Sequence, residues 1–170
     1  MPFESFDENG NYVGIVAEHL NLIEKNLGIK FEKIKTNTWS ETLQKAKEFK
    51  VDMFSNYMNI QKFQDTHISI PMQLKSPIVV IGKKDKHKDF IVSLSQIKDE
   101  KIAVIKDYFY LEEIYKQYPN LNYIEVENST VALNGVSSGI YDVALCSLPV
   151  ATYTISSLSL NNIEIIGKTD

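Results

Sequence analysis

The sequence predicts an α/β fold with two similar lobes, and the main observation is that one helix–strand unit occurs twice. The first copy spans residues 38–59, and the same order of signals returns over residues 129–147. Each copy ends in an apolar strand followed by polar residues. The chain of 170 residues, 44% hydrophobic and 24% charged, is long enough to bury a core. Helix–strand units recur in every α/β protein, so the repeat alone leaves unrelated units as the alternative.

The first copy of the helix–strand unit begins with a capping signal and ends in polar residues that follow its strand. Thr38 and Glu41 have the spacing of a capping box, in which each side chain satisfies a backbone donor of the other. Residues 52–55 predict a buried strand, because the apolar pair Met53-Phe54 does not alternate with charged residues. Ligands of open α/β sheets bind beyond the carboxyl ends of strands. The polar residues at that end are Asn56, Tyr57 and Asn59.

Around this unit, the first half of the chain predicts a helix, two strands and a loop. Residues 14–27 carry apolar side chains at helical spacing, and residues 31–35 alternate as a strand does. Residues 60–67 are polar and predict a loop or a single helical turn. Residues 76–82 form a buried strand, where the chain is expected to cross into the second lobe.

The second half begins with a short helix over residues 93–97 and a strand over residues 101–105. Asp107 is expected to cap a helix over residues 109–118, and a strand over residues 123–126 follows. The chain then enters the second copy of the unit.

In this second copy, Gly139 ends the helix, and an apolar strand over residues 143–146 follows. Pro149 is tolerated in the first turn of the next helix, and residues 163–167 form the last strand. We expect two three-layer α/β/α lobes. Their predicted bounds are residues 1–76 for lobe one, 77–162 for lobe two, and 163–170 for a return crossing toward lobe one.

Composition excludes several classes of function. The net charge is −4 and mixed: the lysines of residues 83–88 alternate with Asp85 and Asp89, which argues against nucleic-acid binding. The single cysteine, Cys146, lies in an apolar strand and behaves as a small hydrophobe. The sequence contains neither a membrane-length apolar run nor a signal peptide. All 18 basic residues are lysine, so an anion site here lacks a bidentate guanidinium.

The usual motifs of catalysis and of metal or phosphate binding are missing. His19, His67 and His87 are far apart in sequence, and none has a partner at a metal-ligand spacing. There is neither a phosphate-binding loop nor a nucleophile elbow. Asp52 and Asp142 each precede a strand, where a turn role is more plausible than catalysis. We therefore predict no catalytic residue, no metal and no cofactor.

Aromatic side chains beside strand ends indicate a small-molecule pocket instead. Trp39 opens a helix, Tyr57 follows one strand, and residues 108–110 follow another. Aromatic rings with a few amides, hydroxyls and a lysine are typical of such pockets. The alternative is that these rings only fill the lobe interiors.

The order of short segments along the whole chain resembles the bacterial extracellular solute-binding proteins of family 3. That family has the type II periplasmic binding protein fold, also called the Venus flytrap. The phrases FDENGNYVGI and IEIIGKT are similar to flytrap sensor domains of membrane histidine kinases and diguanylate cyclases. The segments that carry the resemblance are Pro2–Glu4, Asn9-Gly10, Tyr12–Gly14, Trp39–Glu41, Val51-Asp52, Ile68–Pro71, Lys101–Ile105, and Ser138-Gly139 with Asp142.

The resemblance implies a two-lobed domain truncated at both ends, which closes on a small polar, amino-acid-like metabolite outside the cytoplasm. The full-length protein would be tethered to a membrane, with a homodimer as one possible assembly. Two alternatives are a substrate-binding protein of an ABC transporter and a cyclohexadienyl-dehydratase-like enzyme. Lys62 and Lys106 are the titratable candidates for the enzyme, and no carboxylate joins them. The module itself is therefore expected not to be an enzyme.

The resemblance also implies which residues touch the ligand. The family's clamp arginine has no counterpart: Lys62 takes its place when counting back from Pro71, and Phe63 when counting forward from Asp52. Ser147 stands where the family has the acidic residue that holds the ligand ammonium. A less zwitterionic ligand, or a degenerate site, is therefore expected. The implied ligand-binding residues are Trp39, Asn56, Tyr57, Asn59, Lys62, Lys106, Tyr108, Phe109 and Ser147.

Overall fold

The computed structural model describes residues 2–55, 63, 65–68, 70, 76–87 and 89–169. The chain divides into two compact units, Met1–Asn37 and Thr38–Asp170. The predicted lobe boundaries near residues 76 and 162 remain a prediction.

The first unit begins with a hairpin of β1 (Ser5–Phe6) and β2 (Tyr12–Val13), which pair antiparallel. The Asp7 carboxylate holds the turn by accepting the backbone N–H groups of Asn9 and Asn11 at 2.9 and 2.8 Å. An aspartate that bonds the backbone just beyond it is a common way to stabilise a turn. The carboxylate thus fixes the turn that joins β1 to β2.

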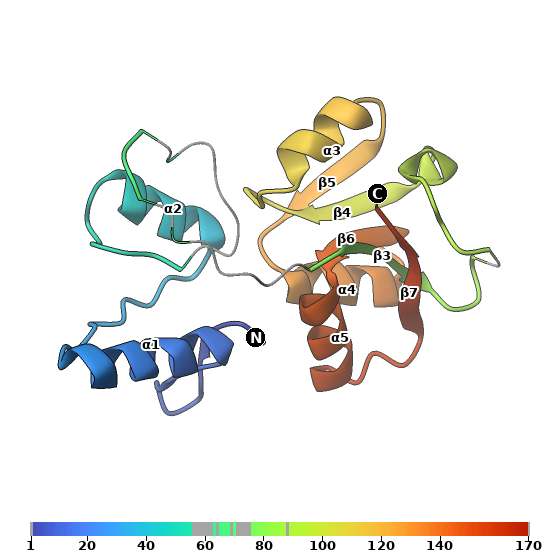
Figure 1. Ribbon diagram of the computed structural model, residues 1–170. Coiled ribbons are helices and arrows are strands. Elements are labelled where there is room, and N and C mark those ends of the chain that lie inside the picture. The colour runs from blue at the N-terminus through green and yellow to red at the C-terminus, as the bar shows by residue number, and fades with distance from the viewer. Residues whose placement is uncertain are drawn as a thin grey trace. The chain divides into compact units, whose positions relative to one another are not determined.

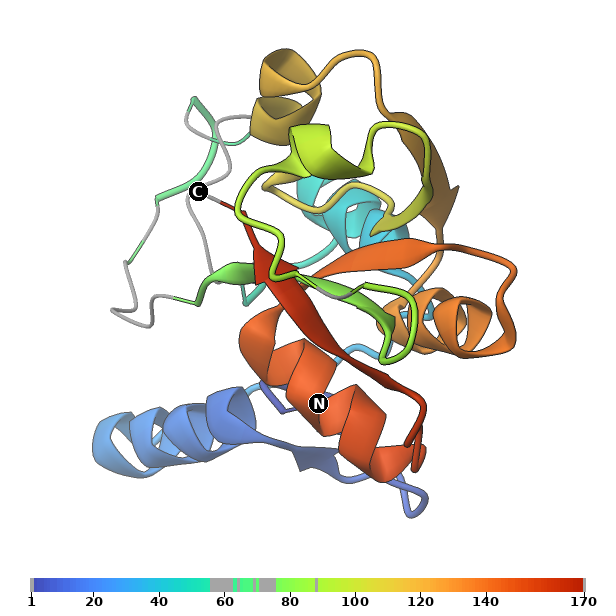
Figure 2. The ribbon, with the colours of Figure 1, turned by 90° about the vertical axis from the view of Figure 1, so that its right-hand side faces the viewer.

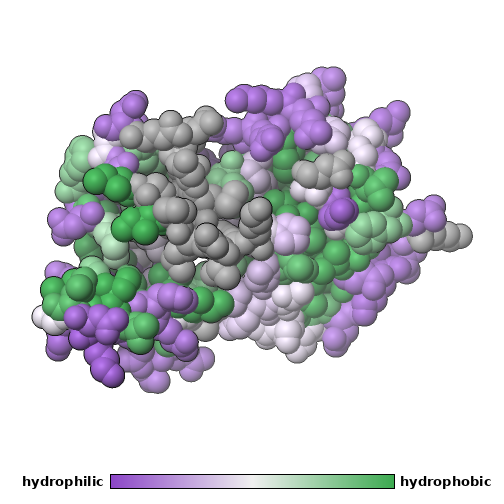
Figure 3. Space-filling view, in the orientation of Figure 1, coloured by the Kyte–Doolittle hydropathy of each residue, from purple (hydrophilic) through white to green (hydrophobic). Residues whose placement is uncertain are grey.

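The helix predicted over residues 14–27 is α1 (Ile15–Leu27), and it ends at Gly28 in the left-handed conformation, φ 67°. Only Val16 and Ala17 of α1 are buried. Other apolar side chains of this unit are exposed, and many of them gather over α1 (Figure 3). They are Ile15, Leu22, Ile23, Leu27, Ile29 and Ile34.

Two predicted strands are wrong: residues 31–35 and residues 52–55 are irregular. Among the residues that the structure describes, neither segment hydrogen-bonds to a neighbouring strand. An alternating or apolar pattern becomes a strand only where such a neighbour accepts and donates its backbone bonds. Both segments have the pattern, but neither has a pairing partner among the described residues.

The second unit begins with α2 (Trp39–Lys47), which Thr38 caps as predicted. The Thr38 hydroxyl accepts the backbone N–H of Glu41 at 3.2 Å. An N-cap of this kind satisfies one of the amides that a helix leaves without a partner.

The rest of the second unit is built on one five-stranded sheet, with the strand order β5-β4-β6-β3-β7 (Figure 1). Strand β4 is parallel to β5 and β6, whereas β3 is antiparallel to β6 and β7. These strands confirm the five predicted between residues 76 and 167. They are β3 (Ile78–Lys83), β4 (Lys101–Ile105), β5 (Asn122–Val126), β6 (Val143–Ser147) and β7 (Ile163–Lys168).

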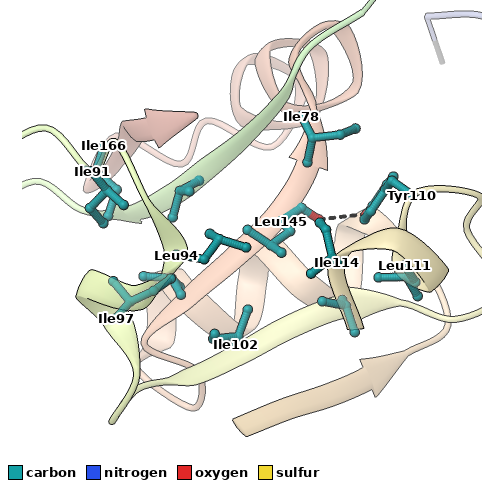
Figure 4. Packing of buried hydrophobic residues seen from close by; sticks show 13 residues of the cluster. Ile78, Ile91, Leu94, Ile97, Ile102, Tyr110, Leu111, Ile114, Leu145 and Ile166 are labelled. Atoms are coloured by element: carbon teal, nitrogen blue, oxygen red, sulfur yellow. Dashed lines mark hydrogen bonds between the residues drawn. The ribbon is translucent and has the colours of Figure 1, made fainter. Parts of the chain in front are cut away.

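Helices cover both faces of this sheet, which gives the predicted three-layer sandwich (Figures 1 and 2). The short 3-10 helix η2 (Leu94–Ile97) and α3 (Leu111–Gln117) pack on one face, around Leu145 (Figure 4). On the other face, α4 (Ser129–Ser138) and α5 (Leu148–Ser157) pack around Ile81. None of the described helices is long and apolar enough to cross a membrane.

Asp142 holds the turn between α4 and β6, the role predicted for it. Its Oδ2 accepts the Lys101 backbone N–H at 2.9 Å, and its Oδ1 pairs with the Lys86 ammonium. The Lys86 bond, followed by the Lys101 N–H, lowers the pKa of the Asp142 carboxyl below its usual value. The carboxylate thus fastens the start of β4 to the start of β6.

We expect Asp142→Asn to remove a part of the protein's stability that depends on pH. Because folding lowers this pKa, the carboxylate stabilises the fold above its unfolded pKa and stops doing so as pH falls through the lower folded value. At neutral pH the variant should lose about 1 kcal/mol, and the difference should vanish in acid. Urea unfolding at several pH values measures this. An equal loss at every pH would contradict the assignment.

Candidate functional site

The structure describes five of the predicted ligand-binding residues, Trp39, Lys106, Tyr108, Phe109 and Ser147. The others, Asn56, Tyr57, Asn59 and Lys62, lie outside the described residues. The roles of all of them therefore remain predictions.

Trp39, the first residue of α2, lies against the loop between β4 and α3. Its indole Nε1–H donates to the backbone carbonyl of Asp107 at 3.1 Å. Its ring meets the Tyr108 ring edge-on, with centroids 6.5 Å apart and planes at 80°. The helix N-terminus and this loop, far apart in sequence, thus bring two predicted site residues together.

The helix-cap role predicted for Asp107 is wrong. This residue was expected to cap the following helix, but α3 begins at Leu111, and no side chain caps it. Asp107 has a positive φ of 60°, a conformation that aspartate tolerates better than most residues. Its carboxylate Oδ2 accepts the Ser40 hydroxyl at 2.5 Å instead. The side chain therefore bonds α2 rather than α3, and no local pattern in the sequence indicates a partner 67 positions away.

Tyr110 anchors the loop in the core. Its buried hydroxyl donates to the Leu145 carbonyl at 3.0 Å (Figure 4), and burial raises its pKa well above the usual value. The rings of Tyr108 and Phe109 meet the Tyr110 ring edge-on, at 5.8 and 5.3 Å. Both are partly buried and pack on the core beneath them. For Phe109 in particular, interior packing explains much of its position.

Ser147 and Lys106 come at the carboxyl ends of neighbouring parallel strands, β6 and β4. These ends share one edge of the sheet, where ligands bind in open α/β folds. Ser147 is buried, whereas the side chain of Lys106 is exposed. Beside Ser147, burial raises the pKa of the Cys146 thiol to about 12, so the thiol stays protonated at neutral pH. This agrees with the expectation that Cys146 behaves as a small hydrophobe.

A cluster of aromatic rings extends from Trp39 along the same unit. Phe54 lies 6.5 Å from the Trp39 ring, and Phe63 lies 5.1 Å from Phe54. Phe63, one of the two positions considered for the missing arginine, is buried and packs edge-on against His67. His67 also stacks on Phe49 at 5.6 Å. Phe54 thus connects the Trp39 ring to this group of packed rings.

Comparison with known proteins gives one family match and several relatives. The sequence profile of the bacterial extracellular solute-binding proteins, family 3, matches residues 1–121. The virulence sensor protein BvgS of Bordetella pertussis (strain Tohama I) is 21% identical over 157 residues. That similarity covers 92% of this chain but only 12% of BvgS, so the chain spans about an eighth of its length.

Solved structures agree with the family match. A histidine kinase sensor domain with similarity to periplasmic binding proteins superposes with a TM-score of 0.84 and 20% identity. The alignment covers 98% of this chain and 72% of that domain. The arginine-bound form of truncated ArgBP from T. maritima has a TM-score of 0.80 and 20% identity, with 98% and 76% covered. The predicted type II periplasmic binding protein fold is confirmed.

Proposed function

The chain belongs to the bacterial extracellular solute-binding protein family 3, and from this premise we propose that it is the ligand sensor of a membrane signalling protein. The observation that carries the proposal is the contact of Trp39 with Asp107 and Tyr108. An aromatic ring at a helix start and a polar loop at a strand end together form the kind of surface that holds a small molecule. In this proposal, a small polar metabolite binds there and shifts the domain between conformations.

Similarity to signalling proteins supports the sensor role over solute delivery. BvgS is called a virulence sensor protein, and it matches over 92% of this chain. A solved structure similar to this chain is also described as a histidine kinase sensor domain. The similarity to ArgBP supports a second candidate, the substrate-binding protein of a transporter for amino-acid-like solutes. Membrane tethering, a location outside the cytoplasm and a homodimer all belong to the sensor proposal.

An enzyme on this fold receives less support from the site. Acid–base catalysis needs a titratable group held next to the reacting atom. The described lysine candidate, Lys106, is exposed. Burial keeps the Tyr110 hydroxyl and the Cys146 thiol protonated. The proposal therefore treats the domain as a binding module.

A thermal-shift screen of small metabolites tests the binding function. A ligand that binds only the folded state at 100 times its Kd stabilises the protein by about 2.7 kcal/mol, which raises the melting temperature. We expect Trp39→Ala to abolish this increase. Phe90→Ala is the matched control, since Phe90 is an exposed ring in the loop before η2. If the ligand raised the melting temperature of Trp39→Ala as much as that of the unaltered protein, the proposed ligand contact with Trp39 would be wrong.

The signalling role has a separate test. In the full-length protein, the identified ligand should change autophosphorylation or cyclase activity, and Trp39→Ala should remove that response. An unchanged output with a saturating ligand would favour the delivery role.

A further inference from the structure

We propose that Asp107 makes this site selective for organic cations without a carboxylate, such as amines, guanidines or quaternary ammonium compounds. The inference rests on the proposed function, because it names the ligand class of the same site. Asp107 was not among the residues that the sequence predicted for the ligand.

The first step is that the Asp107 carboxylate lies in a fixed place between two elements. Its backbone carbonyl accepts the Trp39 indole N–H at 3.1 Å, and its Oδ2 accepts the Ser40 hydroxyl at 2.5 Å. Two bonds from adjacent residues of α2 therefore hold both the main chain and the side chain of Asp107. Its position next to Trp39 is built into the fold.

The second step is that this carboxylate keeps capacity for a cation. Two carboxylate oxygens offer about four acceptor sites, and Ser40 occupies one of them. Within the described part of the chain, no lysine or histidine forms an ion pair with Asp107. The exposed Lys106 side chain next to it in sequence is screened by solvent.

The third step is that the aromatic rings around Asp107 favour the same charge. The Trp39 and Tyr108 rings stand at 80° to each other, and the Trp39 indole N–H reaches the Asp107 backbone carbonyl. The face of an aromatic ring attracts a cation, most strongly when the ring is tryptophan. A carboxylate with two such rings attracts an ammonium or guanidinium group and repels an anion.

The fourth step is that several N–H donors beside Asp107 already have acceptors within the described part of the chain. The Trp39 indole N–H is bonded to Asp107. In the loop, the backbone N–H groups of Lys106, Tyr108 and Leu111 donate to Val126, Ile105 and Tyr108 carbonyls at 3.0, 3.3 and 3.1 Å. An anion that used these donors would have to break their bonds, and any anion at this site would approach the Asp107 charge. Cation binding requires neither.

Two matched pairs of compounds test the assignment by titration calorimetry. Agmatine and arginine share a guanidinium group, and choline and glycine betaine share a quaternary ammonium, but in each pair only the second compound has a carboxylate. We expect agmatine or choline to bind at least about tenfold more tightly than its partner. Asp107→Asn should remove that preference. Asp107→Gly should do the same, and glycine suits the positive φ at this position, so a folding defect is avoided.

Asp99→Asn is the matched control, because Asp99 is exposed and precedes β4, whereas Asp107 follows it. This variant should keep the full preference. The assignment is overturned if arginine or betaine binds as well as its partner, if neither cation binds, or if both Asp107 variants keep the preference. When another metabolite still stabilises the protein through Trp39, the cation assignment fails alone. When no metabolite of any class stabilises it, the proposed function fails too.

Discussion

Replacement of Ile81 by alanine is expected to lower the free energy of unfolding by about 2–5 kcal/mol. Ile81 lies in β3, next to the centre of the sheet, and is fully buried at 0% exposure. It belongs to the cluster between the sheet and the helices α4 and α5. Removing its outer carbons leaves a cavity that closely packed neighbours cannot fill. Urea unfolding followed by circular dichroism measures the loss.

Ile140→Ala provides the control for this prediction, since it makes the same chemical change at a side chain that is 62% exposed. Its cost should be within about 0.5 kcal/mol. Equal losses for the two variants would mean that the face of the sheet covered by α4 and α5 is not a packed core.

The second large effect is expected from Gly14→Ala in the first unit. Gly14 precedes α1 with φ 115° and ψ 178°, a conformation that is open almost only to glycine. A β-carbon built there lies 2.5 Å from the Phe3 carbonyl oxygen, which is backbone and cannot turn aside. Strain and overlap together should destabilise this unit by about 3 kcal/mol.

Hydrogen exchange locates the Gly14→Ala effect in the chain. The amides of Ile15 and Val16 donate to the carbonyls of Pro2 and Phe3 at 3.3 and 2.9 Å, and these amides should lose protection. The matched control is Gly10→Ala, which also has a positive φ, 81°, but has nothing within 4 Å of the added carbon. Similar exchange in the two variants would show that the contact with Phe3 is unimportant.

Sequence patterns predicted the second half of the chain best, because local and long-range signals agree there. Asn128 caps α4, and Gly139 ends this helix with φ 86°. The apolar run after Asp142 finds parallel and antiparallel neighbours on its two sides. Each local preference is met by a tertiary partner, which is the condition for a pattern to be reliable.

The failed strands and the missed aspartate have one cause in common: each depends on a partner that is distant in sequence. The alternation over residues 31–35 contains no information about which strand would pair with it. Asp107 has the spacing of a helix cap, yet its carboxylate bonds Ser40, 67 positions earlier in the chain. The family resemblance indicated Trp39 and Tyr108 but not the residue between them that accepts the Trp39 N–H.

The small molecule is proposed to bind against Trp39, which is the only tryptophan in the chain. Its fluorescence therefore reports the site without any added label. In a titration with a metabolite that raises the melting temperature, we expect a saturable change in tryptophan emission, with the same Kd that calorimetry gives. A metabolite that stabilises the protein and leaves the emission unchanged throughout the titration would place the binding site elsewhere.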